Sequence, residues 1–224
     1  MIFADRAEAG RHLARHLLKY ADRDDVIVLG VPRGGIPVAF EIATRLRVPL
    51  DVLVLRKLGV PGQEELAFGA IASGGVRILD PDTIRESRLT ASEINAVIQI
   101  EEQELRRRDR EYRAGRPPLR LAGLTVILVD DGIATGSSMR AAIRALRQMK
   151  PARLVLAVPV SPPFTTARLR SEVDDLICLE SPEPFYGVGQ FYEDFSQVSD
   201  AQVRDLLRRA SQQQIAQPYS TLPA

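Results

Sequence analysis

Several features common in proteins are scarce or absent in this 224-residue sequence. There is one cysteine, Cys178, which excludes an intrachain disulfide framework and a cysteine-rich metal site. No apolar run approaches the roughly 20 residues that span a bilayer. The first residues, MIFADRAEAG, lack the basic and apolar regions of a signal peptide. A cytoplasmic protein that does not enter the membrane is therefore expected.

Net charge is also almost absent, since 30 Lys and Arg residues face 29 Asp and Glu residues. A protein that binds nucleic acid over a broad surface usually carries a basic excess, so nucleic acid is not expected as a partner. The content of 45% apolar and 26% charged residues is typical of a globular protein. The length suits one domain, which we expect to cover residues 1–224.

Apolar runs alternate with amphipathic stretches along the chain. The patterns predict buried strands at 26–30, 50–55, 124–129, 153–160 and 175–180, and helices at 5–20, 37–46, 90–114, 137–149, 164–172 and 199–210. A hairpin is expected at 65–79, with Gly74 and Gly75 at its turn. The strand–loop–helix–strand order predicts an α/β fold with a mostly parallel sheet flanked by helices. Residues 211–224 are expected to be frayed or to bind a partner.

The segment VILVDDGIATGSSMRAAI (126–143) is the most informative. A buried strand runs into Asp130 and Asp131, then into a loop of small and hydroxylated residues, then into a helix. Backbone N–H groups of residues 134–138, together with the helix N-terminus, form a donor surface suited to phosphate. Paired carboxylates at the carboxyl end of a strand suit vicinal hydroxyls or a hydrated Mg²⁺. The segment therefore predicts a site for a ribose 5-phosphate.

Other interpretations of this loop explain less of it. A Walker A loop needs a Gly-Lys-Ser/Thr ending, and this loop contains no lysine. A response-regulator receiver places its paired acids near the N-terminus rather than past mid-chain. A plain strand-to-helix turn with an aspartate cap leaves the convergence of small residues, hydroxyls and acids unexplained.

VILVDDGIATGSS resembles the signature of type I phosphoribosyltransferases that binds phosphoribosyl pyrophosphate (PRPP). The resemblance implies that Asp130 and Asp131 are the catalytic carboxylates, which hold the ribose 2′ and 3′ hydroxyls and Mg²⁺ through water or those hydroxyls. It also implies a cradle for the 5-phosphate made of Gly132, Ile133, Ala134, Thr135, Gly136, Ser137 and Ser138. An acceptor nitrogen would then replace pyrophosphate at C1. Family members are often dimers, so a homodimer is a further implication.

A second strand–glycine loop–helix, VIVLGVPRGGIPVAFEIATRL (26–46), comes earlier in the chain. Arg33, Gly34 and Gly35 offer a cation and close backbone donors to an anion. The segment is similar to the pyrophosphate-binding loop of the same family, which implies a cis peptide between Pro32 and Arg33. A plain strand-to-helix turn with an exposed arginine is the alternative.

The segment LRKLGVPG (55–62) follows the second predicted strand. Arg56 and Lys57 should lie at the carboxyl end of that strand, on the same rim as the other two loops. Adenine-type members of the family carry a similar Arg-Lys-x-Gly run there. A solvated strand end is the alternative.

Seven arginines against two acids lie between Arg106 and Arg120, a local charge of +5 that the total conceals. The family has a flexible loop between its second and third core strands that closes over pyrophosphate. The resemblance places that loop at 80–118, enlarged by a helix. Its candidate arginines are Arg107, Arg110 and Arg113. The alternative is a solvated helix laced by pairs such as Glu102–Arg106 and Glu104–Arg108.

The opposite imbalance occurs at residues 171–203, which contain eight acids and no lysine or arginine. The resemblance implies a small C-terminal hood at 181–200 that selects the acceptor, with Phe185, Tyr186 and Tyr192 as candidate pocket residues. An acidic hood favours a neutral or amine-bearing acceptor over an anion. Ala134 stands where 6-oxopurine enzymes carry an aspartate, as in adenine-type members. The sequence names neither the acceptor nor the general acid or base.

Two further hypotheses share the same phosphate cradle. One is a non-enzymatic regulator that responds to PRPP or a nucleotide, because a fold does not determine a function. The other is a phosphate-ester or N-glycosidic hydrolase. A Mg²⁺-dependent phosphoribosyltransferase accounts for more of the motifs and is the leading hypothesis.

Overall fold

The computed structural model describes residues 1–113 and 116–216. At its centre is a five-stranded sheet in the order β2-β1-β6-β7-β8, in which each neighbouring pair is parallel. The strands are β1 (Val26–Gly30), β2 (Leu50–Val52), β6 (Thr125–Val129), β7 (Arg153–Val160) and β8 (Asp175–Glu180). This arrangement confirms the predicted α/β class.

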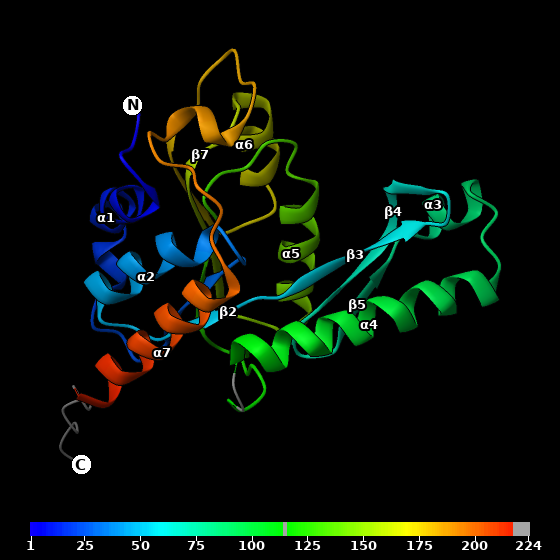
Figure 1. Cartoon of the computed structure of the whole chain (residues 1–224), viewed down its shortest axis with the longest axis horizontal. Coiled ribbons are helices and arrows are strands. Elements are labelled where there is room, and N and C mark those ends of the chain that lie inside the picture. The colour runs from blue at the N-terminus through cyan, green and yellow to red at the C-terminus, as the bar shows by residue number, and fades with distance from the viewer. Residues whose placement is uncertain (114–115, 217–224) are drawn as a thin grey trace.

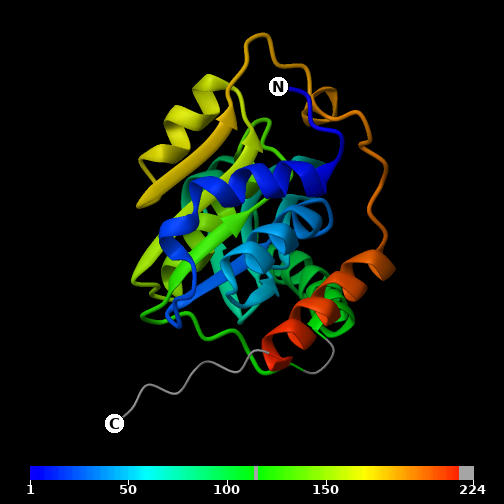
Figure 2. The same cartoon turned by 90° about the vertical axis from the view of Figure 1, so that its left-hand side faces the viewer.

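Helices cover both faces of the central sheet (Figures 1 and 2). One face carries α1 (Arg6–His16), α2 (Gly35–Leu46) and α7 (Asp200–Ala216), and the other carries α5 (Ser137–Gln148) and α6 (Pro163–Arg170). A short 3-10 turn, η1 (Leu18–Tyr20), follows α1. Side chains along β1 point alternately to the two faces of the sheet, so Val28 is buried beneath α2 and Leu29 beneath α5. Such double burial explains why the strands are continuous apolar runs.

A second sheet extends away from the first as an arm (Figure 1). It contains β3 (Leu55–Val60), β4 (Gln63–Ala72) and β5 (Val76–Leu79), all antiparallel. The predicted hairpin is confirmed, and Gly74 and Gly75 at its turn have φ angles of +86° and +79°. The single strand predicted at 50–55 is wrong, because the chain leaves the central sheet after Val52 and enters β3. The segment LDVLVL is apolar apart from Asp51 and has no periodicity that marks this change of sheet.

Two helices follow the arm, α3 (Pro81–Glu86) and α4 (Ala91–Arg113). The helix predicted at 90–114 is therefore confirmed over the described residues 91–113, and α3 and α4 fill most of the segment 80–118, predicted to be a loop enlarged by a helix. Ile98, Leu105 and Tyr112 of α4 are buried in the main core. Their apolar spacing fixes α4 against β3 and α7, a packing that the charge-rich composition of this segment hides.

The hood predicted at 181–200 crosses the carboxyl ends of the strands and contains η2 (Val188–Phe191). It does not stand alone, because Phe3 donates its N–H to Phe191 O at 2.8 Å and accepts from Glu193 N at 2.8 Å. The N-terminus and this segment lie side by side in Figure 2. The N-terminal residues are therefore part of the hood. In the described ranges, no helix has both the length and the apolar character needed to cross a membrane.

Candidate functional site

The two glycine loops meet where the direction of strand order reverses. From β1 the chain proceeds to β2 on one side, whereas β6, β7 and β8 follow on the other. Ligands of open α/β sheets bind at such a switch point, beyond the carboxyl ends of the strands. The loop after β1 contacts the end of β6 directly, since Val31 N donates to Val129 O at 2.9 Å. The structure thus brings together the two motifs predicted from sequence.

Gly34 and Gly35 permit a very close approach between these loops. A Cβ atom on Gly34 would lie 1.9 Å from Asp131 Oδ2, and one on Gly35 would lie 2.7 Å from Val129 O. A larger residue at either position would push the loops apart. The peptide between Pro32 and Arg33 is cis, which confirms the prediction made from the motif. The Arg33 side chain is partly exposed, with Nη1 3.9 Å from Asp200 Oδ1.

Asp130 and Asp131 form a carboxylate pair at the end of β6. The backbone N–H of Asp131 donates to Asp130 Oδ1 at 2.9 Å. Burial, reinforced by the negative charge of Asp131, raises the pKa of Asp130 well above its ordinary value, and Arg6 acts in the opposite direction. The pair therefore favours a ligand that brings a cation or hydroxyl donors.

The acid pair also fits a magnesium ion that is shared with a substrate. Within the part of the chain that the structure describes, no cluster of three or more His, Cys, Asp or Glu residues could form a metal cage. Protein-bound Mg²⁺ commonly uses one or two carboxylates and completes its shell with water and substrate oxygens. Asp130 and Asp131 match that minimal donor set.

The predicted phosphate cradle follows the acid pair. Ile133 is buried and anchors the loop through its N–H, which donates to Val160 O at 2.9 Å, whereas residues 134, 135, 137 and 138 are exposed. Gly136 has φ +78° and precedes α5 without a side-chain cap. Among the described residues, no acceptor lies within hydrogen-bonding distance of the N–H groups of residues 134–138. These open donors at a helix N-terminus are suited to an anion.

One residue outside the loop holds it in shape. Thr165 Oγ1 on α6 donates to Ala134 O at 2.8 Å. A Cβ on Gly136 would lie 2.8 Å from Thr165 Cγ2, so the two elements are tightly packed. The Thr165 hydroxyl therefore satisfies the Ala134 carbonyl, which would otherwise be a free acceptor beside the open N–H groups.

Arg56 and Lys57 do not lie at a strand end, as the sequence predicts, but inside β3. Arg56 Nε donates to Glu101 Oε2 of α4 at 2.6 Å. The Arg56 side chain is therefore paired on the α4 side of the arm, and a role for it in binding pyrophosphate stays a prediction. Lys57 is the next residue on the strand, and its side chain therefore faces the opposite side.

The arginines of α4 also serve other contacts. Arg107 is exposed and bridges Glu104 and Glu111 at 2.8 and 2.9 Å, and Arg110 is exposed. The ion pairs given as the alternative are present, at 3.3 Å for Glu102–Arg106 and 2.6 Å for Glu104–Arg108.

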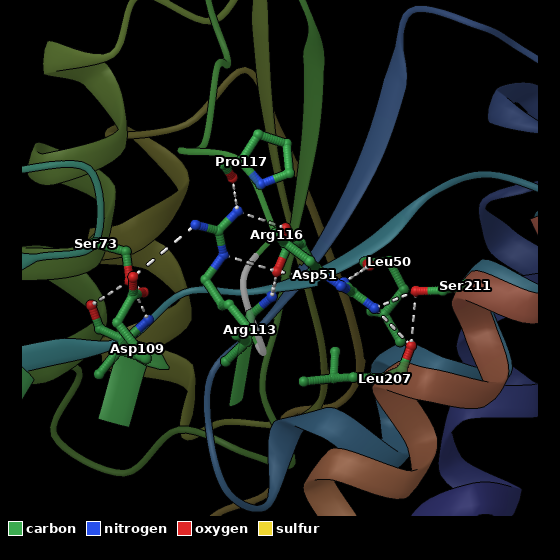
Figure 3. Close-up of polar contacts among 11 residues, drawn as sticks. Leu50, Asp51, Ser73, Asp109, Arg113, Arg116, Pro117, Leu207 and Ser211 are labelled. Atoms are coloured by element: carbon green, nitrogen blue, oxygen red, sulfur yellow. Dashed lines mark hydrogen bonds and ion pairs between the residues drawn. The ribbon is translucent and has the colours of Figure 1, made fainter. Parts of the chain in front are cut away.

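Arg113 is only 5% exposed and belongs to a buried polar network (Figure 3). Its Nη2 lies 3.0 Å from Asp51 Oδ2 and 2.6 Å from Pro117 O. Arg116 adds contacts from Nη1 to Leu50 O at 3.0 Å and from Nη2 to Leu207 O at 2.6 Å. The network joins α4, β2 and α7. The prediction that Arg113 closes over pyrophosphate from a mobile segment is therefore wrong.

The predicted acceptor residues have different surroundings. Phe185 stacks on Phe191 with ring centroids 5.5 Å apart, and Tyr186 is 86% exposed. Tyr192 is buried with its ring 5.6 Å from that of Phe3, and its hydroxyl donates to Asp131 O at 2.5 Å. Burial raises the pKa of that hydroxyl. Tyr192 thus packs the base of the hood, contrary to the expectation that its ring faces an acceptor.

Arg6 is a site residue that sequence reasoning misses. Its Nε lies 2.7 Å from Asp131 Oδ2, its Nη1 donates to Ser196 O at 2.9 Å, and its Cζ is 4.0 Å from the Phe195 ring centroid. The partner carboxylate is 125 residues away in sequence. One local signal exists, because an arginine in the first turn of a helix opposes the helix dipole.

Comparison with known proteins agrees with this site. The family model described as phosphoribosyl transferase domain matches residues 2–196. A Mycobacterium tuberculosis protein assigned by name to the phosphoribosyl transferases is 47% identical over 209 residues, which are 93% of this chain and 47% of that protein. The bifunctional protein PyrR of Chloroflexus aurantiacus is 30% identical over 57% of this chain and 66% of its own length.

A solved structure is similar over nearly the whole molecule. The protein TT1426 of Thermus thermophilus has a TM-score of 0.83 and 40% identity, covering 93% of this chain and 99% of that one. The chain spans about half the length of the Mycobacterium tuberculosis relative that it matches. The family model nevertheless covers both glycine loops, the acid pair and most of the hood. The chain belongs to the phosphoribosyl transferase domain family.

Proposed function

We propose that this protein transfers the 5-phosphoribosyl group of PRPP to a nitrogen acceptor and releases pyrophosphate in a Mg²⁺-dependent reaction. The observation that carries the proposal is the junction of the loops at 33–35 and 130–138. Gly34 lies directly against Asp131, and the adjoining N–H groups of residues 134–138 are open. One ligand with an anion at each end and a diol between them fits this arrangement.

The two ends of PRPP have separate places in the proposal. The 5-phosphate binds the N-terminus of α5 and residues 132–138, where backbone donors and the hydroxyls of Thr135, Ser137 and Ser138 are available. Pyrophosphate binds the loop 33–35, where Arg33 supplies the charge. Lys57 remains a candidate for the same end, because its side chain faces away from the Arg56–Glu101 pair.

The acid pair holds the ribose between these anions. Asp130 and Asp131 accept the 2′ and 3′ hydroxyls and would hold Mg²⁺ through water or those hydroxyls. When bound, Mg²⁺ would supply positive charge that stabilises the departing pyrophosphate. Burial and, after it, the negative charge of Asp131 raise the pKa of Asp130, and a bound cation would compensate the second of these causes.

The chain's own contribution to the rate is electrostatic. The bond between C1 and pyrophosphate breaks as positive charge develops on the ribose ring and negative charge on the leaving group. Asp130 and Asp131 lie on the side of the positive charge, and Arg33 with the N–H groups of its loop lies on the side of the negative charge. Preorganised groups of this kind are worth on the order of 10²- to 10³-fold in rate each.

The hood would receive the acceptor. Glu193 and Asp194 are exposed there, so the local charge favours a neutral or amine-bearing nitrogen compound over an anion. Tyr186 is exposed and available for stacking, and Phe185 offers the ring face that does not stack on Phe191, whereas Tyr192 is used in packing. Ala134 leaves no acidic side chain beside the base, which disfavours 6-oxopurines.

The test is release of labelled pyrophosphate from PRPP in the presence of Mg²⁺ and a panel of acceptors, including adenine, hypoxanthine, orotate and simple amines. The proposal requires acceptor-dependent release that the double variant Asp130→Asn/Asp131→Asn abolishes and the control Asp205→Asn, at a half-exposed position of α7, retains. Saturable PRPP binding without turnover on any acceptor would instead indicate the regulator. Release that depends on water alone would indicate the hydrolase.

A further inference from the structure

Arg6 occupies a position that the proposed reaction does not yet explain. It is the first residue of α1, yet its guanidinium is nearly buried, with 11% of the side chain exposed. Its three contacts lie on different parts of the site, namely Asp131 of the acid pair, the Phe195 ring and the Ser196 carbonyl. One side chain therefore spans the boundary between the ribose site and the hood.

These contacts are of the strong kind. The 2.7 Å distance from Nε to Asp131 Oδ2 is that of a charge-assisted hydrogen bond. A guanidinium 4.0 Å from the Phe195 ring centroid gains cation–π attraction that partial burial strengthens. Helix stability does not account for an arginine here, because the helix dipole disfavours a cation in the first turn. The arginine at this position is therefore explained by its contacts and not by the stability of α1.

The orientation of Asp131 follows from this arrangement. Its Oδ2 is held by Arg6 and packs against Gly34, where a Cβ would lie only 1.9 Å away, whereas a Cβ there would be 3.0 Å from Oδ1. A carboxylate has two acceptor oxygens, so fixing Oδ2 leaves Oδ1 for a ligand. Arg6 therefore determines which oxygen of the acid is available.

The hood meets the acid motif at two further points. Tyr192 donates its hydroxyl to the Asp131 carbonyl at 2.5 Å. A Cβ on Gly132 would lie 2.4 Å from Val188 Cγ1, so η2 rests directly on the start of the phosphate loop. Arg6 is the charged member of this three-point contact. Its fork of donors is the part that reaches both the acid and the hood.

We propose that Arg6 is a positioning residue that orients Asp131 and attaches the hood to it, so that the ribose site and the acceptor wall are set by one guanidinium. The ribose half of this inference rests on the proposed function. The hood half does not, because the contacts to Phe195 and Ser196 are present without any ligand.

The test compares Arg6→Gln and Arg6→Lys with Arg11→Gln, a change at an exposed position of the same helix. Lysine keeps the positive charge beside Asp131 but carries a single ammonium group in place of the forked guanidinium, so it cannot also reach the Ser196 carbonyl. Steady-state kinetics should show the acceptor KM rising about tenfold in both Arg6 variants, with kcat changing less than about threefold. The PRPP KM should rise about tenfold in Arg6→Gln and return to within about twofold of wild type in Arg6→Lys.

Hydrogen exchange of residues 188–196 in the unliganded protein provides a readout independent of PRPP. Exchange should be about tenfold faster in both Arg6 variants and unchanged in Arg11→Gln. If the wild type fails to bind PRPP, the proposed function fails and this exchange still decides the role of Arg6. Equal exchange and equal KM values in Arg6→Gln and Arg11→Gln would overturn the inference. If Arg6→Gln does not fold, as judged by circular dichroism, the exchange and the KM pattern of Arg6→Lys decide.

Discussion

Two largely buried carboxylates of this protein, Asp51 and Asp131, are paired with arginines in different surroundings. Asp51 lies 3.0 Å from Arg113 and 3.5 Å from Arg116, and its Oδ1 also accepts from Val52 N. Asp131 lies 2.7 Å from Arg6, beside a second carboxylate and a loop of open N–H groups. Asp51 is paired with two arginines. Asp131 is paired with one arginine, whose charge also acts on the neighbouring carboxyl of Asp130.

The comparison shows what separates a structural ion pair from a binding site. Burial and distance do not, since Asp51 and Asp131 are both largely buried and both closely paired. The difference is whether the positive charges and N–H donors near each carboxylate are already paired within the chain. Around Asp51 they are used internally to join β2, α4 and α7 (Figure 3). Around Asp131 they remain available to a ligand.

The largest expected effect is on stability at the structural pair. Asp51→Asn leaves the buried Arg113 with only the more distant Asp109 carboxylate, at 3.9 Å, so the free energy of unfolding should fall by about 3 kcal/mol. Urea denaturation measures this change, and Asp205→Asn, which removes half-exposed helix ion pairs to Arg208 and Arg209, is the control, expected to stay within about 0.5 kcal/mol of wild type. A loss of less than about 1 kcal/mol at Asp51 would contradict the structural assignment.

The next effect concerns the contact between the two loops. Gly34→Ala places a Cβ against Asp131 Oδ2 and should separate the loops, which weakens PRPP binding about a hundredfold, or about 2.7 kcal/mol. Calorimetric titration with PRPP and Mg²⁺ measures the loss. A Cβ on Gly187 would meet no atom within 4 Å, so Gly187→Ala is the matched control. Equal affinities in the two variants would show that the loops do not act on one ligand.

A smaller effect is expected at the support of the phosphate loop. Thr165→Val removes the donor to Ala134 O at nearly constant volume and should weaken PRPP binding about fivefold, or about 1 kcal/mol. Thr165→Ser keeps the hydroxyl and should bind within about twofold of wild type. The same titration compares them, and a valine variant that binds as tightly as the serine variant would remove Thr165 from the account.

The smallest effect should have the opposite sign to that at Asp51. Because burial and the charge of Asp131 raise the pKa of Asp130, the folded chain keeps the proton on this carboxyl to a higher pH than the unfolded chain, whose ordinary pKa is 3.8. The acid therefore costs stability progressively as pH rises from 3.8 toward its raised pKa. Asp130→Asn should stabilise the unliganded protein by about 0.5 kcal/mol at pH 7 and have little effect below pH 3.8. Urea denaturation at several pH values checks this, and destabilisation at pH 7 would be inconsistent with a strained acid pair.

The sequence predicts the local part of this site well. The strand, acid pair, loop and helix of residues 126–143 are contiguous, so their order along the chain is also their order in space. The loop at 33–35 was expected on the same rim because parallel strands share their carboxyl edge, and the contact of Gly34 with Asp131 agrees. Even the cis peptide before Arg33 follows from the motif.

The missed features depend on distant contacts or on burial. Arg6 pairs with Asp131, which is 125 residues away in sequence, and the sequence of α1 does not indicate that partner. Arg113 belongs by composition to a basic, solvated segment, yet it follows the buried Tyr112 at the end of α4 and pairs with Asp51 in the interior. The apolar pattern of residues 50–55 does not show that the chain changes sheet there. Arg56 therefore lies in β3 of the arm and pairs with a residue of α4. Local pattern gives the elements, whereas these outcomes are set by how the elements pack.

The central claim is that the loops at 33–35 and 130–138 bind the two ends of one PRPP molecule across the acid pair. Titration calorimetry with PRPP and Mg²⁺ tests it directly on the wild type, the double variant Asp130→Asn/Asp131→Asn and the control Asp205→Asn. We predict saturable binding of one PRPP per chain in the wild type and control, and at least about a hundredfold weaker binding in the double variant. No saturable binding by the wild type, or equal affinity in all three proteins, would contradict the claim.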